Sequence, residues 1–269
     1  MSHFTVLVIG DDYEKILAPF NEQPDEDDED CADNIYWECD GADGETYTAD
    51  TKAELEKEVA DAKTTIVEGP WLNNSQGYWD WYVLGGRWQG NLRLKNKNTS
   101  GQKGRPGVMS KPDLDPLNAD SALIKDIDFD GMYAEAAEKA AIIYDRVMSI
   151  FGELPVHMTF KEMRDKYRYA DGTINHEEVR KRYHEQPRII ALSTVRETDP
   201  QFFIDADEFL VSKEKYIEQA KLNRVATYAF IDLEGNWHAA DEDEYEKIFK
   251  DTLASLSPDT RISVVDCHV

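Results

Sequence analysis

The two ends of the chain carry short apolar runs that restrict its fold more than any other feature. Residues 4–9 and 262–267 are rich in aliphatic and β-branched side chains, a composition typical of buried strands. Such strands are poor edges, because both faces need cover and both backbone sides need partners. We therefore expect both terminal strands in one antiparallel or mixed sheet.

Local patterns between these runs predict several helices. Thr51 and Glu54 have capping-box spacing and predict a helix over residues 51–63. A helical region is expected over residues 132–186, where apolar residues recur every three or four positions and a second capping box begins at Thr159. Residues 188–195 are apolar and β-branched but too few to distinguish helix from strand.

The last third of the chain alternates strand and helix patterns. Residues 225–232 predict a strand that turns into a short partner at 237–239. A helix is expected over 241–256, and a final strand over 261–269. The expected fold class is α+β, with the helical middle region packed on one face of the sheet.

A chain of 269 residues buries a sizeable core, and we expect one elaborated domain over residues 1–269. Residues 22–30 contain seven acids in nine positions and predict a mobile acidic loop. Residues 96–116 are rich in Asn, Gly, Ser, Lys and Pro and predict a basic flexible loop.

The chain has 55 acidic and 30 basic residues, a formal net charge of -25. Its surface should repel nucleic acid and anionic lipid, so neither is an expected direct partner. The acidic side chains either form a solvated surface or mimic nucleic acid and bind a basic protein. No apolar run approaches the roughly 20 residues of a membrane span. The three cysteines show neither a disulfide framework nor a zinc pattern, which favours the cytoplasm.

Aromatic residues cluster in one segment, where four of the six tryptophans lie between positions 71 and 88. The candidate ligand-binding residues are Trp79, Trp81, Tyr82, Gly85, Gly86, Arg87 and Trp88. Aromatic rings stack on planar groups, glycines let backbone N–H groups approach a ligand, and an arginine fork matches phosphate or carboxylate. In the structural alternative, Trp79, Trp81 and Leu92 are alternating core residues of a hairpin. Arg87 then pairs with a carboxylate such as Asp80 and braces the hairpin.

Positive charge concentrates directly after this cluster. Residues 87–111 include seven basic side chains and no acid. A positive segment in so acidic a chain favours an anionic, nucleotide-like ligand held between it and the aromatic residues. The alternative is an exposed loop that lysines decorate.

The C-terminus places Asp266, Cys267 and His268 in succession. Neighbours in a strand point to opposite faces, so Asp266 and His268 share one side and Cys267 faces away. A Cys–His catalytic pair is therefore not expected, whereas Asp266 and His268 can join His3 or His238 in a metal or acid–base site. Walker, HExxH, GxSxG and dinucleotide motifs are absent from the sequence, so no cofactor or metal is assigned.

Three motifs together resemble a group of uncharacterised phage proteins: the opening MSHFTVLVIG, the core YWDWYxxGGRWxG and the ending VVDCH plus an aliphatic residue. They occupy residues 1–10, 78–90 and 264–269. The resemblance implies an accessory protein made in an infected bacterium, where counter-defence or host takeover is a common role. Many relatives carry a Gly- and Trp-rich insert after the hairpin that ends at 239, which this chain lacks.

Three functional hypotheses remain open, and the sequence leaves undecided whether the chain is an enzyme. The first is binding of an anionic, nucleotide-like ligand by the aromatic residues and Arg87. The second is an acidic inhibitor or nucleic-acid mimic that blocks a host defence protein without catalysis. The third is a metal-dependent hydrolase using Asp11, Asp12, Asp266 and His268.

Overall fold

The computed structural model describes residues 2–22, 34–40, 46–58, 68–74, 77–97, 99, 101–108, 115–169, 172–242 and 244–269. Contacts divide the chain into two compact units. The first comprises Met1–Asp128 and Val225–Val269, and the second comprises Phe129–Arg224. Each has a hydrophobic core of its own, and each is described by itself. The single domain expected from chain length stays a prediction.

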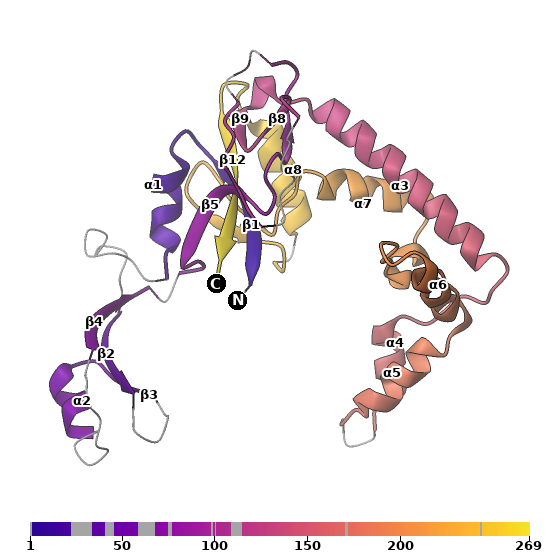
Figure 1. Cartoon of the computed structure of the whole chain (residues 1–269), viewed down its shortest axis with the longest axis horizontal. Helices are drawn as coiled ribbons and strands as arrows, with labels where there is room; N and C mark the ends of the chain where they lie inside the picture. The colour runs from indigo at the N-terminus through magenta and orange to yellow at the C-terminus, as the bar shows by residue number, and fades with distance from the viewer. Residues whose placement is uncertain are drawn as a thin grey trace. The chain divides into compact units, whose positions relative to one another are not determined.

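The first unit is built on a seven-stranded mixed sheet (Figure 1). Across the sheet the order is β11 (Trp237–Ala239), β10 (Ala229–Ile231), β1 (His3–Ile9), β12 (Arg261–His268), β5 (Trp81–Gly86) and β7 (Arg105–Pro106), while β9 (Ser121–Leu123) also pairs with β12. β1 runs parallel to β10 and antiparallel to β12. Both terminal strands are central, and the α+β class with a mixed sheet is confirmed.

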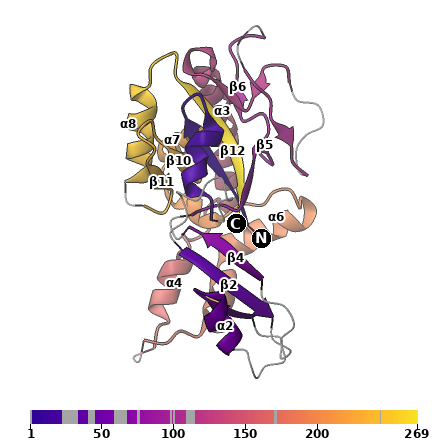
Figure 2. The ribbon, with the colours of Figure 1, turned by 90° about the vertical axis from the view of Figure 1, so that its left-hand side faces the viewer.

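Alternation along the strands separates two faces of this sheet. One face packs against α1 (Tyr13–Leu17), and its buried core contains Val6, Val8, Leu17, Trp79, Ala229, Ile231, Val265 and Cys267. On the other face, Phe230 of β10 contacts Tyr245 and Phe249 of α8 (Tyr245–Ser255), with ring centroids 5.7 and 5.4 Å apart. The helices α1 and α8 therefore cover opposite faces, and Figure 1 shows them on either side of the strands, which Figure 2 shows turned by 90°.

The end of β12 departs from its apolar pattern. Val264 is buried opposite Leu7, on the face that α8 covers. Two and four residues later, Asp266 and His268 lie on this same face and are also buried. Polar side chains are thus buried where β12 ends, beside the start of β1.

Two smaller sheets complete the first unit. β3 (Thr46–Ala49), β2 (Asn34–Asp40) and β4 (Glu68–Asn73) form one, and β6 (Leu92–Arg93) and β8 (Asn118–Ala119) form the other. The Thr51 cap is present: its hydroxyl accepts the Glu54 N–H at 3.2 Å, and α2 (Lys52–Glu58) follows. Residues 59–63 of the predicted helix and 23–30 of the predicted acidic loop lie outside the described residues.

The predicted basic loop is described in part, and that part is attached to the seven-stranded sheet. Gln102 N–H donates to the Ser121 carbonyl at 2.7 Å, and Gly107 N–H donates to the Gly86 carbonyl at 2.9 Å. These bonds bring β7 alongside the end of β5. The loop thereby borders the Gly85–Gly86 turn.

The second unit is helical. It contains α3 (Phe129–Phe151), α4 (Phe160–Lys166), α5 (His176–His184), α6 (Pro187–Thr198) and α7 (Lys213–Asn223). The capping box at Thr159 is confirmed. Residues 188–195, which the sequence left undecided, belong to α6: Pro187 suits a first helical turn, and Ile189 and Leu192 reach the unit's core from one helix face.

Candidate functional site

A buried carboxylate lies where β1, β12 and β5 share an end. Asp266 is 1% exposed. Its Oδ1 lies 2.8 Å from His3 Nδ1, and its Oδ2 accepts the backbone N–H of Arg87 at 2.8 Å. A buried charge is tolerated when hydrogen bonds replace its lost hydration. Asp266 therefore fixes both the His3 ring and the loop that follows β5.

A second histidine stands beside His3, because His3 and His268 are directly paired across β1 and β12. His268 Nδ1 lies 2.6 Å from Oδ1 of Asp80. The two imidazole centroids are 5.0 Å apart, with the ring planes at 76°. Each imidazole thus has its own carboxylate, and each Nδ1 is engaged by it.

The Nε2 atoms of these rings are the ones left for solvent or a ligand. No described residue forms a hydrogen bond with Nε2 of His3 or His268. Within the described part of the chain, two buried side-chain nitrogens lack a hydrogen-bond partner, His157 Nδ1 and Arg164 Nε. The Nε2 atoms of His3 and His268 are not among them, so these atoms are not buried without a partner. The His3 and His268 side chains are 13% and 9% exposed.

Trp81 completes the surface around the histidines. It is paired with His268 across β12 and β5. Its indole stacks on the His268 ring at 5.7 Å and 14°, and meets the His3 ring edge-on at 5.5 Å and 85°. Trp81 is nevertheless 45% exposed, so its indole is available to stack on a planar ligand. We call His3, Asp80, Trp81, Asp266 and His268 the histidine site.

The two glycines that follow β5's aromatic residues make room for buried carboxylates. Gly85 and Gly86 have φ of +79° and +51°, in the left-handed region that favours glycine. A Cβ on Gly85 would lie 2.7 Å from the Asp120 carboxylate, and one on Gly86 would overlap Asp266. These contacts within the chain account for both glycines without a ligand.

Asp120 holds the segment that follows β5 in place through backbone hydrogen bonds. It is fully buried, and its two oxygens accept the backbone N–H groups of Gly90 and Gly104, the latter at 2.7 Å. Burial raises the pKa of the Asp120 carboxyl, although these backbone hydrogen bonds act in the opposite direction. Asp120 and Asp266 together determine the path of the loop that carries Arg87.

Two exposed arginines flank the glycine turn. Arg87 follows Gly86 directly, and Arg105 is the strand partner of Gly85 in β7. Neither side chain has an ion pair among the described residues. Two exposed cations that border one turn, without an ion pair to a described carboxylate, favour an anion at this place.

The structure divides the residues predicted to bind a ligand. Trp81, Arg87 and Trp88 are exposed. Trp79 is 5% exposed, and its indole N–H donates to the Leu17 carbonyl at 3.2 Å. Tyr82 packs against the same α1 core, where burial raises its pKa to about 12. Trp79 and Tyr82 are core residues because α1 covers their face, so they do not share a surface with Trp81.

The structural alternative for Arg87 is not what the geometry shows. Asp80, its suggested partner, is hydrogen-bonded to His268 instead. The contact that Arg87 makes with a carboxylate is through its backbone N–H. Its guanidinium is therefore free of the bracing role that pairing with Asp80 would give it.

The remaining basic residues of the 87–111 segment differ in their engagement. Side chains that bond oxygens of their own unit are Arg93, Lys95 and Lys103. Side chains with neither an ion pair nor a side-chain hydrogen bond among the described residues are Arg87, Lys97 and Arg105. Lys111 lies outside the described residues. The free positive charge of the segment thus includes the two arginines at the glycine turn.

The proposed metal-dependent hydrolase site is not assembled. Asp11 and Asp12 follow the last residue of β1, whereas His268 pairs with His3 at the first. Asp12 caps α1, accepting the Lys15 N–H at 3.2 Å. His238 bonds Asp232 at 3.0 Å on β11, away from Asp266. Within the described residues, no group of three or more His, Cys, Asp or Glu side chains is placed to hold a metal ion.

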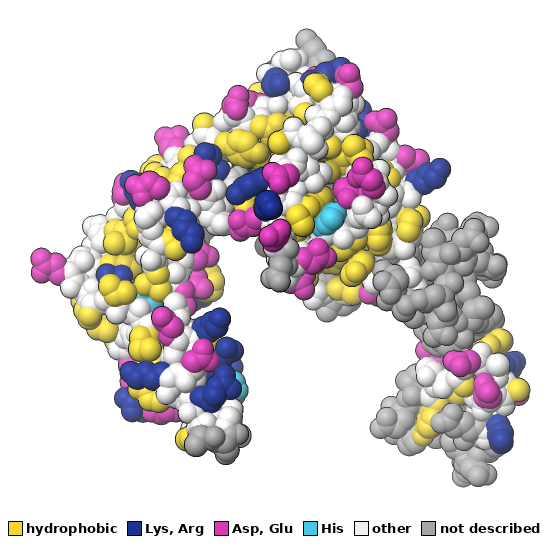
Figure 3. Space-filling model, turned by 180° about the vertical axis from the view of Figure 1, so that it is seen from behind, with side chains coloured by type: hydrophobic (Ala, Val, Ile, Leu, Met, Phe, Trp, Pro, Cys, Tyr) yellow, Lys and Arg dark blue, Asp and Glu magenta, His cyan; other side chains and the backbone are white. Residues whose placement is uncertain are grey.

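Basic side chains also gather on the α4–α5 hairpin of the second unit, outside the segment predicted to bind a ligand (Figure 3). The exposed members are Lys161, Lys166, Arg168, Arg180, Lys181 and Arg182. Several are neutralised locally: Arg182 pairs with Glu178 at 2.8 Å, and Arg168 with Asp165 at 3.2 Å. The density of Lys and Arg over residues 161–182 was the available signal.

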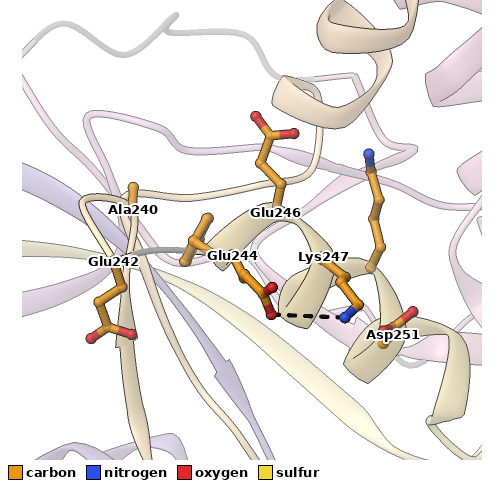
Figure 4. Close-up of a pocket in the computed structure, with 8 residues that line it drawn as sticks. Ala240, Glu242, Glu244, Glu246, Lys247 and Asp251 are labelled. Carbon is orange, nitrogen blue, oxygen red and sulfur yellow. Dashed lines mark ion pairs between the residues drawn. The ribbon is translucent and has the colours of Figure 1, made fainter.

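An open depression lies at the start of α8, with a volume of about 590 Å³ (Figure 4). Its lining is Ala240, Glu242, Glu244, Tyr245, Glu246, Lys247, Lys250 and Asp251. Glu244 pairs with Lys247 at 3.7 Å. The depression contains none of the predicted ligand-binding residues, and its charged lining is that of a solvated surface.

Comparison with known proteins leaves the site to be interpreted from its own geometry. No protein-family model, curated protein or solved structure matches the chain. Among the described residues, no helix combines the length and apolarity that crossing a membrane requires.

Proposed function

We propose that the protein binds an anionic, nucleotide-like ligand at the histidine site and the adjoining arginines. The observation that carries the proposal is the double role of Asp266, which holds the His3 ring with one oxygen and the Arg87 backbone with the other. The His3 ring and the backbone of Arg87 are thereby attached to one buried carboxylate, and among the described residues the Arg87 guanidinium has no ion pair. A nucleotide presents the matching groups, a planar base and a phosphate.

The aromatic half of the interaction would come from Trp81. Its indole is supported by His268 and remains 45% exposed, so stacking on a base would bury area without reordering the side chain. Stacking of a base on an aromatic residue contributes about 1–3 kcal/mol. The support from His268 reduces the rotamer entropy that Trp81 loses on binding.

The anionic half would come from Arg87, with Arg105 beside the same turn. A charge-assisted hydrogen bond to phosphate contributes about 1.5–3 kcal/mol, or roughly ten- to a hundredfold in affinity. The chain's net charge of -25 opposes an anion at a distance, so local cations matter more here than in a neutral protein. Binding should weaken less steeply with salt than binding to a long polyanion, because few phosphates are contacted.

Titration with AMP, monitored by calorimetry and tryptophan fluorescence, tests the proposal. Adenosine carries the base without the phosphate and inorganic phosphate carries the anion alone, so the two probes report on each half of the interaction. Arg87→Ala should weaken AMP binding about ten- to a hundredfold. The unfolding midpoint should not change, because alanine keeps the N–H that bonds Asp266. Lys97→Ala removes the same charge from an exposed site in the same segment and serves as the matched control. Equal affinities of wild type and Arg87→Ala would contradict the proposal.

The biological setting that we propose is an accessory role in a phage-infected bacterium, which the three motifs over residues 1–10, 78–90 and 264–269 support. Counter-defence by capture of a nucleotide-like molecule suits the site. The second hypothesis, an acidic inhibitor of a host defence protein, distributes function over the acidic surface and tolerates loss of Arg87. Native mass spectrometry of protein from infected cells, with wild type and Arg87→Ala compared, distinguishes a retained small molecule from a retained protein.

A further inference from the structure

We propose that His3 and His268 act as a general base and a general acid that hydrolyse a phosphate diester at the histidine site; this inference rests on the binding function above. Its basis is their juxtaposition. They are directly paired on adjacent strands, their ring centroids are 5.0 Å apart, and each Nδ1 faces its own carboxylate. Two Nε2 atoms on one side of the sheet can serve two oxygens of one substrate.

The carboxylates define what each imidazole can do. A carboxylate at Nδ1 keeps a proton on that nitrogen, so the neutral ring presents a lone pair at Nε2 and acts as a base. The protonated ring presents Nε2–H and acts as an acid. Asp266 and Asp80 thus engage the same nitrogen of each ring and leave Nε2 of both for the substrate.

Diester hydrolysis requires the two proton transfers that such a pair supplies. The neutral imidazole takes a proton from water as the water oxygen bonds to phosphorus. The bond from phosphorus to one ester oxygen breaks, and the imidazolium gives its proton to that leaving oxygen. One water is consumed, a phosphate monoester and an alcohol form, and solvent exchange restores the protonation of the two rings.

Arg87 and Trp81 have supporting roles in this step. The Arg87 guanidinium meets the non-bridging phosphoryl oxygens, whose negative charge is redistributed in the transition state. Trp81 holds the base of the substrate and thereby places the phosphate against the two rings. Asp266 is a positioning residue, since it acts through His3 and through the Arg87 backbone.

A third Asp–His pair in the first unit provides a matched control. His238 Nε2 lies 3.0 Å from Asp232 Oδ2, and its ring stacks on Phe230 at 4.5 Å. His238 on β11 pairs with Phe230 on β10, and Phe230 pairs with Leu7 on β1. His238 is therefore two strands away from β1 and level with a residue four positions after His3. It has the same chemical type of pair but lies outside the histidine site.

The substrates for the test are 2′,3′-cyclic AMP and bis(4-nitrophenyl) phosphate, with EDTA present. The wild type should hydrolyse both, with a bell-shaped dependence of kcat/KM on pH. His3→Asn and His268→Asn place an amide N–H where Nδ1 was, so each keeps a donor for its carboxylate and lacks Nε2. Each should lower turnover of the cyclic nucleotide by about 100-fold or more, and AMP titration of each variant separates the loss of binding from the loss of turnover at saturation. His238→Gln should leave turnover unchanged.

The nitrophenyl substrate separates the two roles, because 4-nitrophenolate leaves without a proton. The variant that lacks the acid should therefore lose much less activity on it than on the cyclic nucleotide, while the variant that lacks the base loses activity on both. AMP binding by a wild type that hydrolyses neither diester would overturn the inference and leave the binding function intact. Absence of AMP binding would overturn the binding function itself. Full turnover by either asparagine variant would also overturn the inference.

Discussion

Replacement of Gly85 by alanine is expected to destabilise the first unit far more than the same replacement at Gly235. Both glycines have similar φ, +79° and +84°, so each new Cβ costs about 1–2 kcal/mol of backbone strain. Their surroundings differ. A Cβ at Gly235 meets nothing within 4 Å, whereas at Gly85 it lies 2.7 Å from the Asp120 carboxylate. The comparison therefore separates strain from collision.

The size of the difference follows from the partners of Asp120. This carboxylate is fully buried and accepts backbone N–H groups from Gly90 and Gly104, so it cannot move aside without losing them. Each charge-assisted hydrogen bond contributes about 1.5–3 kcal/mol. We expect a loss of about 4–8 kcal/mol for Gly85→Ala and about 1–2 kcal/mol for Gly235→Ala.

Urea unfolding followed by tryptophan fluorescence measures the difference. All six tryptophans lie in the first unit, so the signal reports this unit without the helical one. At a slope of about 2–3 kcal/mol per molar urea, an additional 3 kcal/mol lowers the midpoint by about 1 M or more. Equal midpoints for the two variants would refute the argument that buried carboxylates, rather than turn geometry alone, require the glycines.

Three further predictions address stability and reactivity. Burial raises the pKa of folded Asp120 above its ordinary 3.8, so the stability that Asp120 contributes is full below that pH and is lost as the pH rises through the folded pKa. Urea titrations should therefore show the wild type losing stability relative to Asp120→Asn above about pH 4. A gain in stability over the same range would contradict this. Burial also raises the pKa of the Cys267 thiol, so with Cys31 and Cys39 replaced by serine, a thiol reagent should label the chain after denaturation and not before. Removal of residues 264–269 deletes the part of β12 that pairs with both β1 and β5, so the first unit should no longer unfold cooperatively. A truncated protein that melts cooperatively would disprove this.

Elements with a local physical cause could be predicted from the sequence. Residues 4–9 and 262–267 are strands because successive β-branched and aliphatic residues suit a sheet buried on both faces. The capping box at Thr159 needs residues within one turn, and the helix begins there. Residues 188–195 are too few to distinguish helix from strand by their own pattern, and their packing into the core of the second unit decided that they are helical.

The aromatic segment shows where local information ends. Alternation predicts that Trp81 and Tyr82 point to opposite faces but not which face is covered. The covering helix α1 packs on the Tyr82 side and buries Trp79 with it. The reason for Gly85 and Gly86 is equally distant in sequence, since the carboxylates that exclude a Cβ belong to Asp120 and Asp266.

The sequence by itself determined that Asp266 and His268 share a strand face and that Cys267 lies opposite, because the period of a strand is two. It offered His3 and His238 equally as their partner. Only the tertiary structure chose between them: the antiparallel register of β1 and β12 brings His3 to Asp266, 263 positions away in the chain, while His238 is held on β11 by Asp232. Strand pairing is a long-range contact, which a periodic pattern within one strand does not specify.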